Sequence, residues 1–63
     1  MRDLIVHNEG SIFLLTAVTP AGEEWIAEHI PSDAMTFGKA IVVEHRYIAN
    51  IVDGAIADGL TVE

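Results

Sequence analysis

The chain has 63 residues, with ten acidic side chains against three basic ones and a formal net charge of −7 at pH 7. It contains no cysteine, which excludes disulfides, thiolate metal sites and a thiol nucleophile. Since 51% of its residues are hydrophobic, we expect one small domain over residues 1–63, too short to enclose a large substrate cavity.

The N-terminal part predicts a β-hairpin. Residues 4–6 and 12–18 are rich in β-branched and large apolar side chains, which favour strands. Between them, Asn8 and Gly10 supply turn chemistry. The second run is apolar at nearly every position, which suits a strand that is central or covered on both faces.

A short helix is predicted over residues 20–30. Thr19 can cap its N-terminus, and Pro31 prevents its simple continuation. Spacing of 100° per residue places Trp25 and His29 on one side of this helix. The other side carries three acidic residues: Glu23, Glu24 and Glu28.

The following segment, residues 31–39, is predicted to be a connection. It has room for one helical turn after Ser32 or Asp33. We expect the two large apolar side chains of this segment, Met35 and Phe37, to pack inward.

The C-terminal part predicts a third strand and a second helix. The strand covers residues 40–44, and the helical period covers residues 46–58. Gly59 can adopt the positive φ that ends a helix, and residues 61–63 can add a short edge strand. The predicted core includes four residues of the two helices: Trp25, Ile48, Ile51 and Val52.

The resulting order is ββαβα, with an optional last strand. The simplest fold class is α/β (α+β), a two-layer sandwich in which both helices pack on one face of a small mixed sheet of three or four strands. If the second and third strands are parallel, the connection between them should be right-handed.

Parts of both halves resemble a group of short uncharacterised bacterial proteins, over about residues 12–63. The resemblance rests on residues 40–48 (AIVVEHRYI), Gly54 and residues 58–60 (DGL), together with residues 19–21 (TPA), Trp25 and Glu28. It implies a bacterial, cytoplasmic protein. It carries no established activity, so it implies no catalytic residue.

Composition also bears on location and partners. A secreted domain of this size normally needs disulfides, which favours a cytoplasmic protein. The apolar runs are far shorter than the roughly 20 residues of a membrane helix, and the N-terminus shows no signal-peptide pattern. The basic residues Arg2, Lys39 and Arg46 are too few to neutralise a phosphate backbone, so we expect no direct nucleic-acid binding.

The three histidines, His7, His29 and His45, lack the close spacing of a zinc site, so we expect no metal and no other cofactor. We interpret His29 as a partly buried imidazole packed on the indole of Trp25, one helical turn earlier. The two serines lie in turn-like sequence outside a nucleophile elbow. The acidic pairs lack an apolar pocket that would raise a carboxyl pKa. We therefore expect no enzyme and no catalytic residue.

One candidate ligand site is an anion-binding corner formed by Thr19, Glu44, His45 and Arg46. If the second and third strands are parallel, their carboxyl ends and two helix N-termini share one edge of the sheet. Arg46 and a protonated His45 would attract an anion, whereas Glu44 would repel it. The alternative, which we favour, is a solvated corner with a local pair between Glu44 and Arg46.

Two functional interpretations remain. The first is a small acidic protein-interaction module, with an unknown partner, that also forms a homodimer, because so short and apolar a chain can bury surface between copies. The alternative is an acidic inhibitor that mimics nucleic acid and occupies a DNA- or RNA-binding protein. In that case Glu23, Glu24 and Glu28 would imitate phosphates, since helix positions i and i+4 lie about 6 Å apart.

Overall fold

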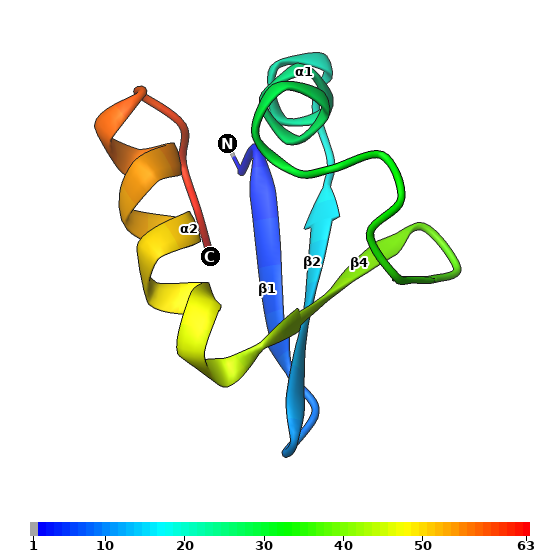
Figure 1. The fold of residues 1–63 in the computed structure, drawn as a ribbon. Helices are drawn as coiled ribbons and strands as arrows, with labels where there is room; N and C mark the ends of the chain where they lie inside the picture. The colour runs from blue at the N-terminus through cyan, green and yellow to red at the C-terminus, as the bar shows by residue number, and fades with distance from the viewer. Residues whose placement is uncertain (1) are drawn as a thin grey trace.

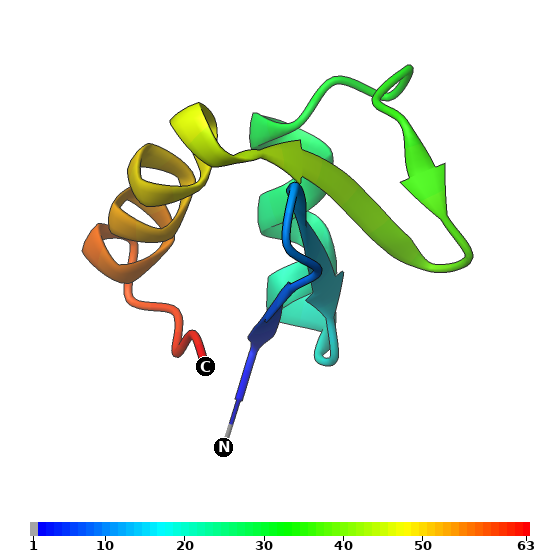
Figure 2. The same ribbon diagram turned by 90° about the horizontal axis from the view of Figure 1, so that it is seen from below.

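The computed structural model describes residues 2–63 (Figure 1). Its elements are β1 (Leu4–Asn8), β2 (Ile12–Ala17), α1 (Pro20–His29), β3 (Thr36–Phe37), β4 (Ala40–Glu44) and α2 (His45–Ala57). The strands form one sheet in the order β1-β2-β4-β3, and the two helices pack on the same side of it (Figure 2). The predicted two-layer α+β fold, its ββαβα order and both helices are confirmed.

The predicted N-terminal hairpin is present. β1 and β2 are antiparallel, with Leu4 opposite Ala17 and Asn8 opposite Phe13. The turn depends on Asn8 and Gly10, as predicted from the sequence. The side-chain oxygen of Asn8 accepts a hydrogen bond from the Gly10 N–H at 2.8 Å, and Gly10 has a φ of 95° that favours glycine.

β2 and β4 are also antiparallel, with Ile12 opposite Glu44. The parallel pairing that we considered for these two strands is therefore wrong, and the right-handed crossover that depended on it does not arise. The parallel element of the sheet is a single bridge between Leu4 and Val62, where the Glu63 N–H donates to the Leu4 carbonyl at 3.1 Å. The optional last strand over residues 61–63 is reduced to this bridge.

The segment between α1 and β4 differs from our expectation. In place of a helical turn after Ser32 or Asp33, the Ala34 N–H closes a tight turn on the Pro31 carbonyl at 3.0 Å. The two-residue strand β3, which we did not predict, then pairs with β4 through a hairpin turn. Met35 and Phe37 are 73% and 67% exposed, so their predicted inward packing is wrong. β3 is an outer strand, and Phe37 lies opposite Ala40, where neither helix covers the sheet.

The core lies between the sheet and the two helices. Leu4 and Leu15 are fully buried, and Val43 of β4 is 6% exposed. Two of the four core residues predicted on the helices are buried: Trp25 of α1 is 7% exposed and Ile48 of α2 is 9% exposed. The other two predicted core residues, Ile51 and Val52, are partly buried and pack against this cluster.

The N-terminus of α1 is held to both chain ends by Asp3. The Thr19 hydroxyl caps the helix by accepting from the Gly22 N–H at 3.1 Å, and it donates to the Asp3 carboxylate at 2.7 Å. The same carboxylate accepts from the Thr61 N–H at 3.0 Å. These two donors, Thr61 first and Thr19 second, lower the pKa of Asp3 because they stabilise its charged form.

α2 ends where the sequence predicts. Gly59 has a φ of 93°, and the Leu60 N–H donates to the Ala55 carbonyl at 3.0 Å, which turns the chain back toward β1. Within residues 2–63, no helix has the length and apolar character needed to span a membrane.

Candidate functional site

The four residues of the predicted anion corner do not come together. Because β2 and β4 are antiparallel, Glu44 lies beside the beginning of β2, whereas Thr19 follows its end. The Thr19 hydroxyl is occupied by the helix cap and by Asp3. The arrangement that would have gathered two helix N-termini at one sheet edge is therefore absent.

The remaining three residues form the solvated corner that we favoured. Arg46 Nη2 donates to Glu44 Oε1 at 3.2 Å, and both side chains are more than half exposed. The Arg46 guanidinium also lies 4.9 Å from the centre of the Tyr47 ring. His45 packs its ring 4.6 Å from that of Phe13. Exposed pairs of this kind contribute about 0–1 kcal/mol and leave no charge free for an anion.

The predicted acidic face of α1 is divided between two sides of the helix. Glu24 and Glu28 line one surface depression together with Asp58. Glu23 lines a different depression, which it shares with Lys39. All three glutamates are exposed. They do not form the continuous row of carboxylates that imitation of a nucleic-acid strand requires.

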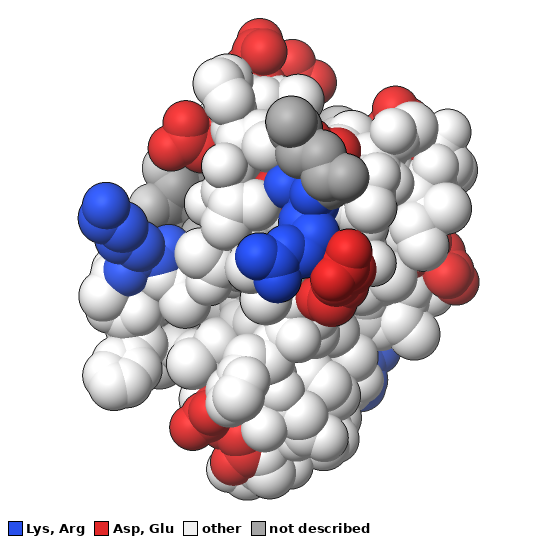
Figure 3. All heavy atoms as spheres, turned by 180° about the vertical axis from the view of Figure 1, so that it is seen from behind, with Lys and Arg blue, Asp and Glu red and all other residues white. Residues whose placement is uncertain are grey.

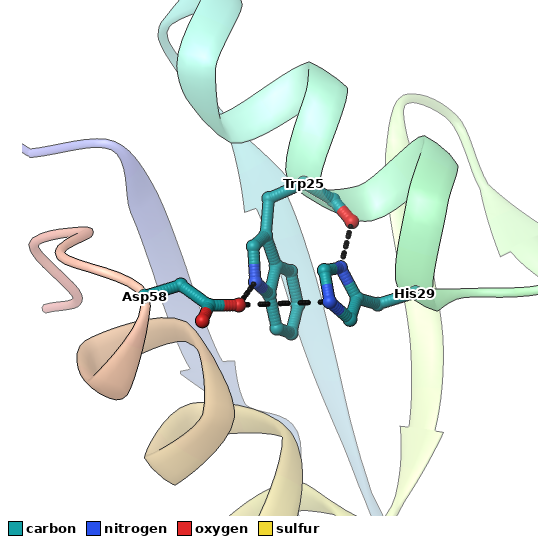
Figure 4. A network of polar contacts seen from close by, with 3 residues as sticks. All are labelled: Trp25, His29 and Asp58. Atoms are coloured by element: carbon teal, nitrogen blue, oxygen red, sulfur yellow. Dashed lines mark hydrogen bonds and ion pairs between the residues drawn. The ribbon is translucent and has the colours of Figure 1, made fainter.

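A polar cluster joins the two helices (Figure 4). His29 stacks on Trp25 with ring centres 4.3 Å apart, which confirms the predicted contact between the two rings, although His29 is exposed and not partly buried as expected. The indole Nε1–H donates to Asp58 Oδ2 at 2.7 Å, and His29 Nε2 lies 3.5 Å from the same oxygen. Sequence reasoning missed Asp58 because it lies 33 residues from Trp25 and has no local pattern in common with it.

This cluster does not have the geometry of a catalytic dyad. His29 Nδ1 contacts the Trp25 carbonyl oxygen at 2.8 Å, while Nε2 faces the Asp58 carboxylate. Both ring nitrogens are therefore directed at protein atoms, and neither points toward open space where a substrate would lie. The arrangement suits a structural contact between α1 and the end of α2.

A shallow groove of about 540 Å³ lies between the end of α1, the following loop, β4 and α2. Its lining is mainly apolar and includes Ile30, Met35, Ile41, Val43 and Ile51. Its polar members, among them Glu44 and Asn50, do not form hydrogen bonds with one another. The groove thus offers apolar contact without a set of convergent polar groups.

The face of the sheet turned away from the helices carries several apolar side chains. Side chains alternate along a strand, and Leu14 lies opposite Val42 on one side and His7 on the other, while Ile5 lies opposite Thr16. Ile5, Leu14 and Val42 are each only partly buried, and within residues 2–63 the helices pack on the opposite face. Phe37 extends this apolar area at the outer strand. We call this area the open sheet face.

Comparisons with protein-family models, with curated proteins and with solved structures found no match to this chain. The resemblance to short bacterial proteins therefore stays a prediction.

Proposed function

We propose that this protein is a small acidic interaction module that forms a homodimer through its open sheet face. The observation that carries the proposal is the apolar character of that face, with Phe37 67% exposed at its margin. Large aromatic side chains next to aliphatic ones are typical anchors of protein interfaces. A second copy would cover Leu14 and Val42, which the helices leave open.

The distribution of charge favours this face for contact between identical copies. Each copy carries a net charge of −7, so two copies repel each other unless they meet where carboxylates are few or neutralised. Seen from behind, uncharged side chains cover much of the molecule, and charged groups lie both near its middle and along its margins (Figure 3). Two carboxylates border the open sheet face. Glu44 is paired with the Arg46 guanidinium at 3.2 Å, and Glu9 contacts the imidazole of His7 at 2.5 Å.

The size of the face sets the expected affinity. Neighbouring strands lie about 4.8 Å apart, and each strand rises about 3.4 Å per residue. The area of the face formed by β1, β2 and β4 is therefore about 300 Å². A standard stable interface buries about 800 Å² on each partner. The dimer should therefore be weak, with association at micromolar or higher concentration.

Sedimentation equilibrium from about 1 μM to 1 mM tests the proposal. We expect the average mass to rise from 6.8 kDa toward twice that value. Leu14→Lys and Phe37→Ala should each weaken dimerisation by at least about tenfold. Ile56→Ala, which truncates a side chain of similar exposure on α2, is the matched control and should leave it unchanged. Far-UV circular dichroism of each variant shows whether it is folded.

A monomer at 1 mM would overturn the proposal. A dimer that is insensitive to Leu14→Lys and Phe37→Ala would place the interface elsewhere. Salt gives an independent test, because screening of the repulsion between two acidic copies should strengthen the dimer. An inhibitor that mimics nucleic acid would behave in the opposite way, since its complex with a basic protein would weaken with salt and with the double change Glu24→Gln and Glu28→Gln.

A further inference from the structure

The cluster of Trp25, His29 and Asp58 joins elements that have few other polar links. Trp25 and His29 are on α1, and Asp58 caps the C-terminal end of α2. The indole also packs against Gly54 of α2, where an added Cβ would lie 3.6 Å from the ring. The side chains of His29 and Asp58 are 43% and 52% exposed, so protons can reach them from solvent.

The contacts fix the position of one proton on His29. A carbonyl oxygen can only accept a hydrogen bond, so the 2.8 Å contact with Trp25 assigns a hydrogen to Nδ1. In the neutral ring, Nε2 then presents its lone pair to the Asp58 carboxylate at 3.5 Å. Adding a proton to Nε2 replaces this repulsion by an attraction between opposite charges.

The charged side chains that line the two depressions beside His29 are all acidic. Glu24 and Glu28 of α1 line the same depression as His29 and Asp58. On its other side, His29 lines the apolar groove, to which Glu44 and Tyr47 contribute from β4 and α2. Neither depression includes a lysine or an arginine among its lining residues. The face of the indole also stabilises a cation stacked upon it.

We propose that His29, when it takes up a proton, forms an ion pair with Asp58 that links α1 to the C-terminal end of α2. We call this ion pair the clasp. It makes the packing of the two helices sensitive to pH. Imidazole is the side chain that ordinarily changes its charge between pH 5 and 8. The clasp forms at mildly acidic pH and is lost as the pH rises and the Nε2 proton leaves.

The first experiment determines the tautomer of His29 by ¹⁵N-resolved NMR of the imidazole ring. At pH 8 we expect the hydrogen of the neutral ring on Nδ1, and at pH 5.5 we expect hydrogens on both nitrogens. A neutral ring that carries its hydrogen on Nε2 would overturn the proposal, because Asp58 would then have a donor without any change of charge. His45 serves as the internal reference, since its ring lies tilted against that of Phe13 and forms no ion pair within residues 2–63.

The second experiment compares thermal unfolding at pH 5.5 and pH 8. The melting temperature of the natural chain should exceed that of His29→Gln by about 2–5 °C more at pH 5.5 than at pH 8. Asp58→Asn keeps an oxygen that can accept the indole N–H, but it removes the charge. In that background, His29→Gln should have the same effect at both pH values.

His45→Gln is the matched control, and its effect should not increase in acid. A His29→Gln effect that is equal at both pH values in the natural chain would overturn the proposal. An increase in acid that persists in Asp58→Asn would also overturn it, because the proton would then act through another group.

Discussion

Replacement of Gly22 by alanine separates helix propensity from packing, because the two predict opposite results. Gly22 lies in the first turn of α1, where alanine should stabilise a helix by about 0.5–1 kcal/mol. A Cβ at this position would lie 2.3 Å from the carbonyl oxygen of Asp3, and no real Cβ approaches an atom within 3.0 Å. The Asp3 backbone must therefore move, although it accepts a hydrogen bond from the Val18 N–H at 2.9 Å.

Forced overpacking of this kind costs about 1–3 kcal/mol, so the net destabilisation should be about 1–2 kcal/mol. A domain of this length has a total stability of about 3–9 kcal/mol, and the melting temperature should fall by about 5–15 °C. Thermal unfolding followed by circular dichroism measures this change. Gly54→Ala in α2 is the matched control: its Cβ would make an ordinary 3.6 Å contact with Trp25, so it should be neutral or stabilising. A Gly22→Ala chain as stable as the natural one would refute the reasoning.

Two further predictions concern the core and the Asp3 linkage. Leu15→Ala removes a fully buried side chain from the central strand and should lower the free energy of unfolding by about 2–5 kcal/mol. Most molecules of this variant should therefore be unfolded in mild denaturant. A decrease below about 1 kcal/mol would show that the surrounding side chains close around the smaller residue. The hydrogen bonds that Asp3 accepts lower its pKa. The charged Asp3 carboxylate therefore stabilises the fold at pH values above the ordinary aspartate pKa of about 3.9. This stabilisation is lost as the pH falls through the lowered pKa. The difference in melting temperature between the natural chain and Asp3→Asn should therefore shrink from pH 5 to pH 2, and a constant difference would contradict the linkage.

Features with a short-range cause could be predicted from the sequence. The cap at Thr19, the hairpin turn at Gly10 and the helix end at Gly59 each depend on residues within a few positions along the chain. The Glu44–Arg46 pair and the stack of His29 on Trp25 are of the same kind, because two and four positions separate the partners.

Features that depend on the tertiary arrangement could not be predicted in this way. The direction of β4 relative to β2 leaves the alternation of side chains unchanged, so the sequence pattern allows both directions. β3 has two residues, which is too short for a period to be recognised. The link between Trp25 and Asp58, like that between Asp3 and Thr61, joins residues far apart in the chain whose proximity follows from the fold.

The apolar side chains of β2 are a physical reason to expect a partner on the open sheet face. A strand with one face in water usually alternates apolar and polar residues, whereas a strand covered on both faces is apolar throughout. β2 is close to the second pattern, with Thr16 as its one polar residue: Leu15 is fully buried against the helices, while its neighbour Leu14 points to the open sheet face. A two-layer domain of 63 residues has only one core, so the described chain cannot cover both faces itself. The pattern of β2 therefore agrees with the dimer that we propose, in which a second copy on the open sheet face would cover Leu14.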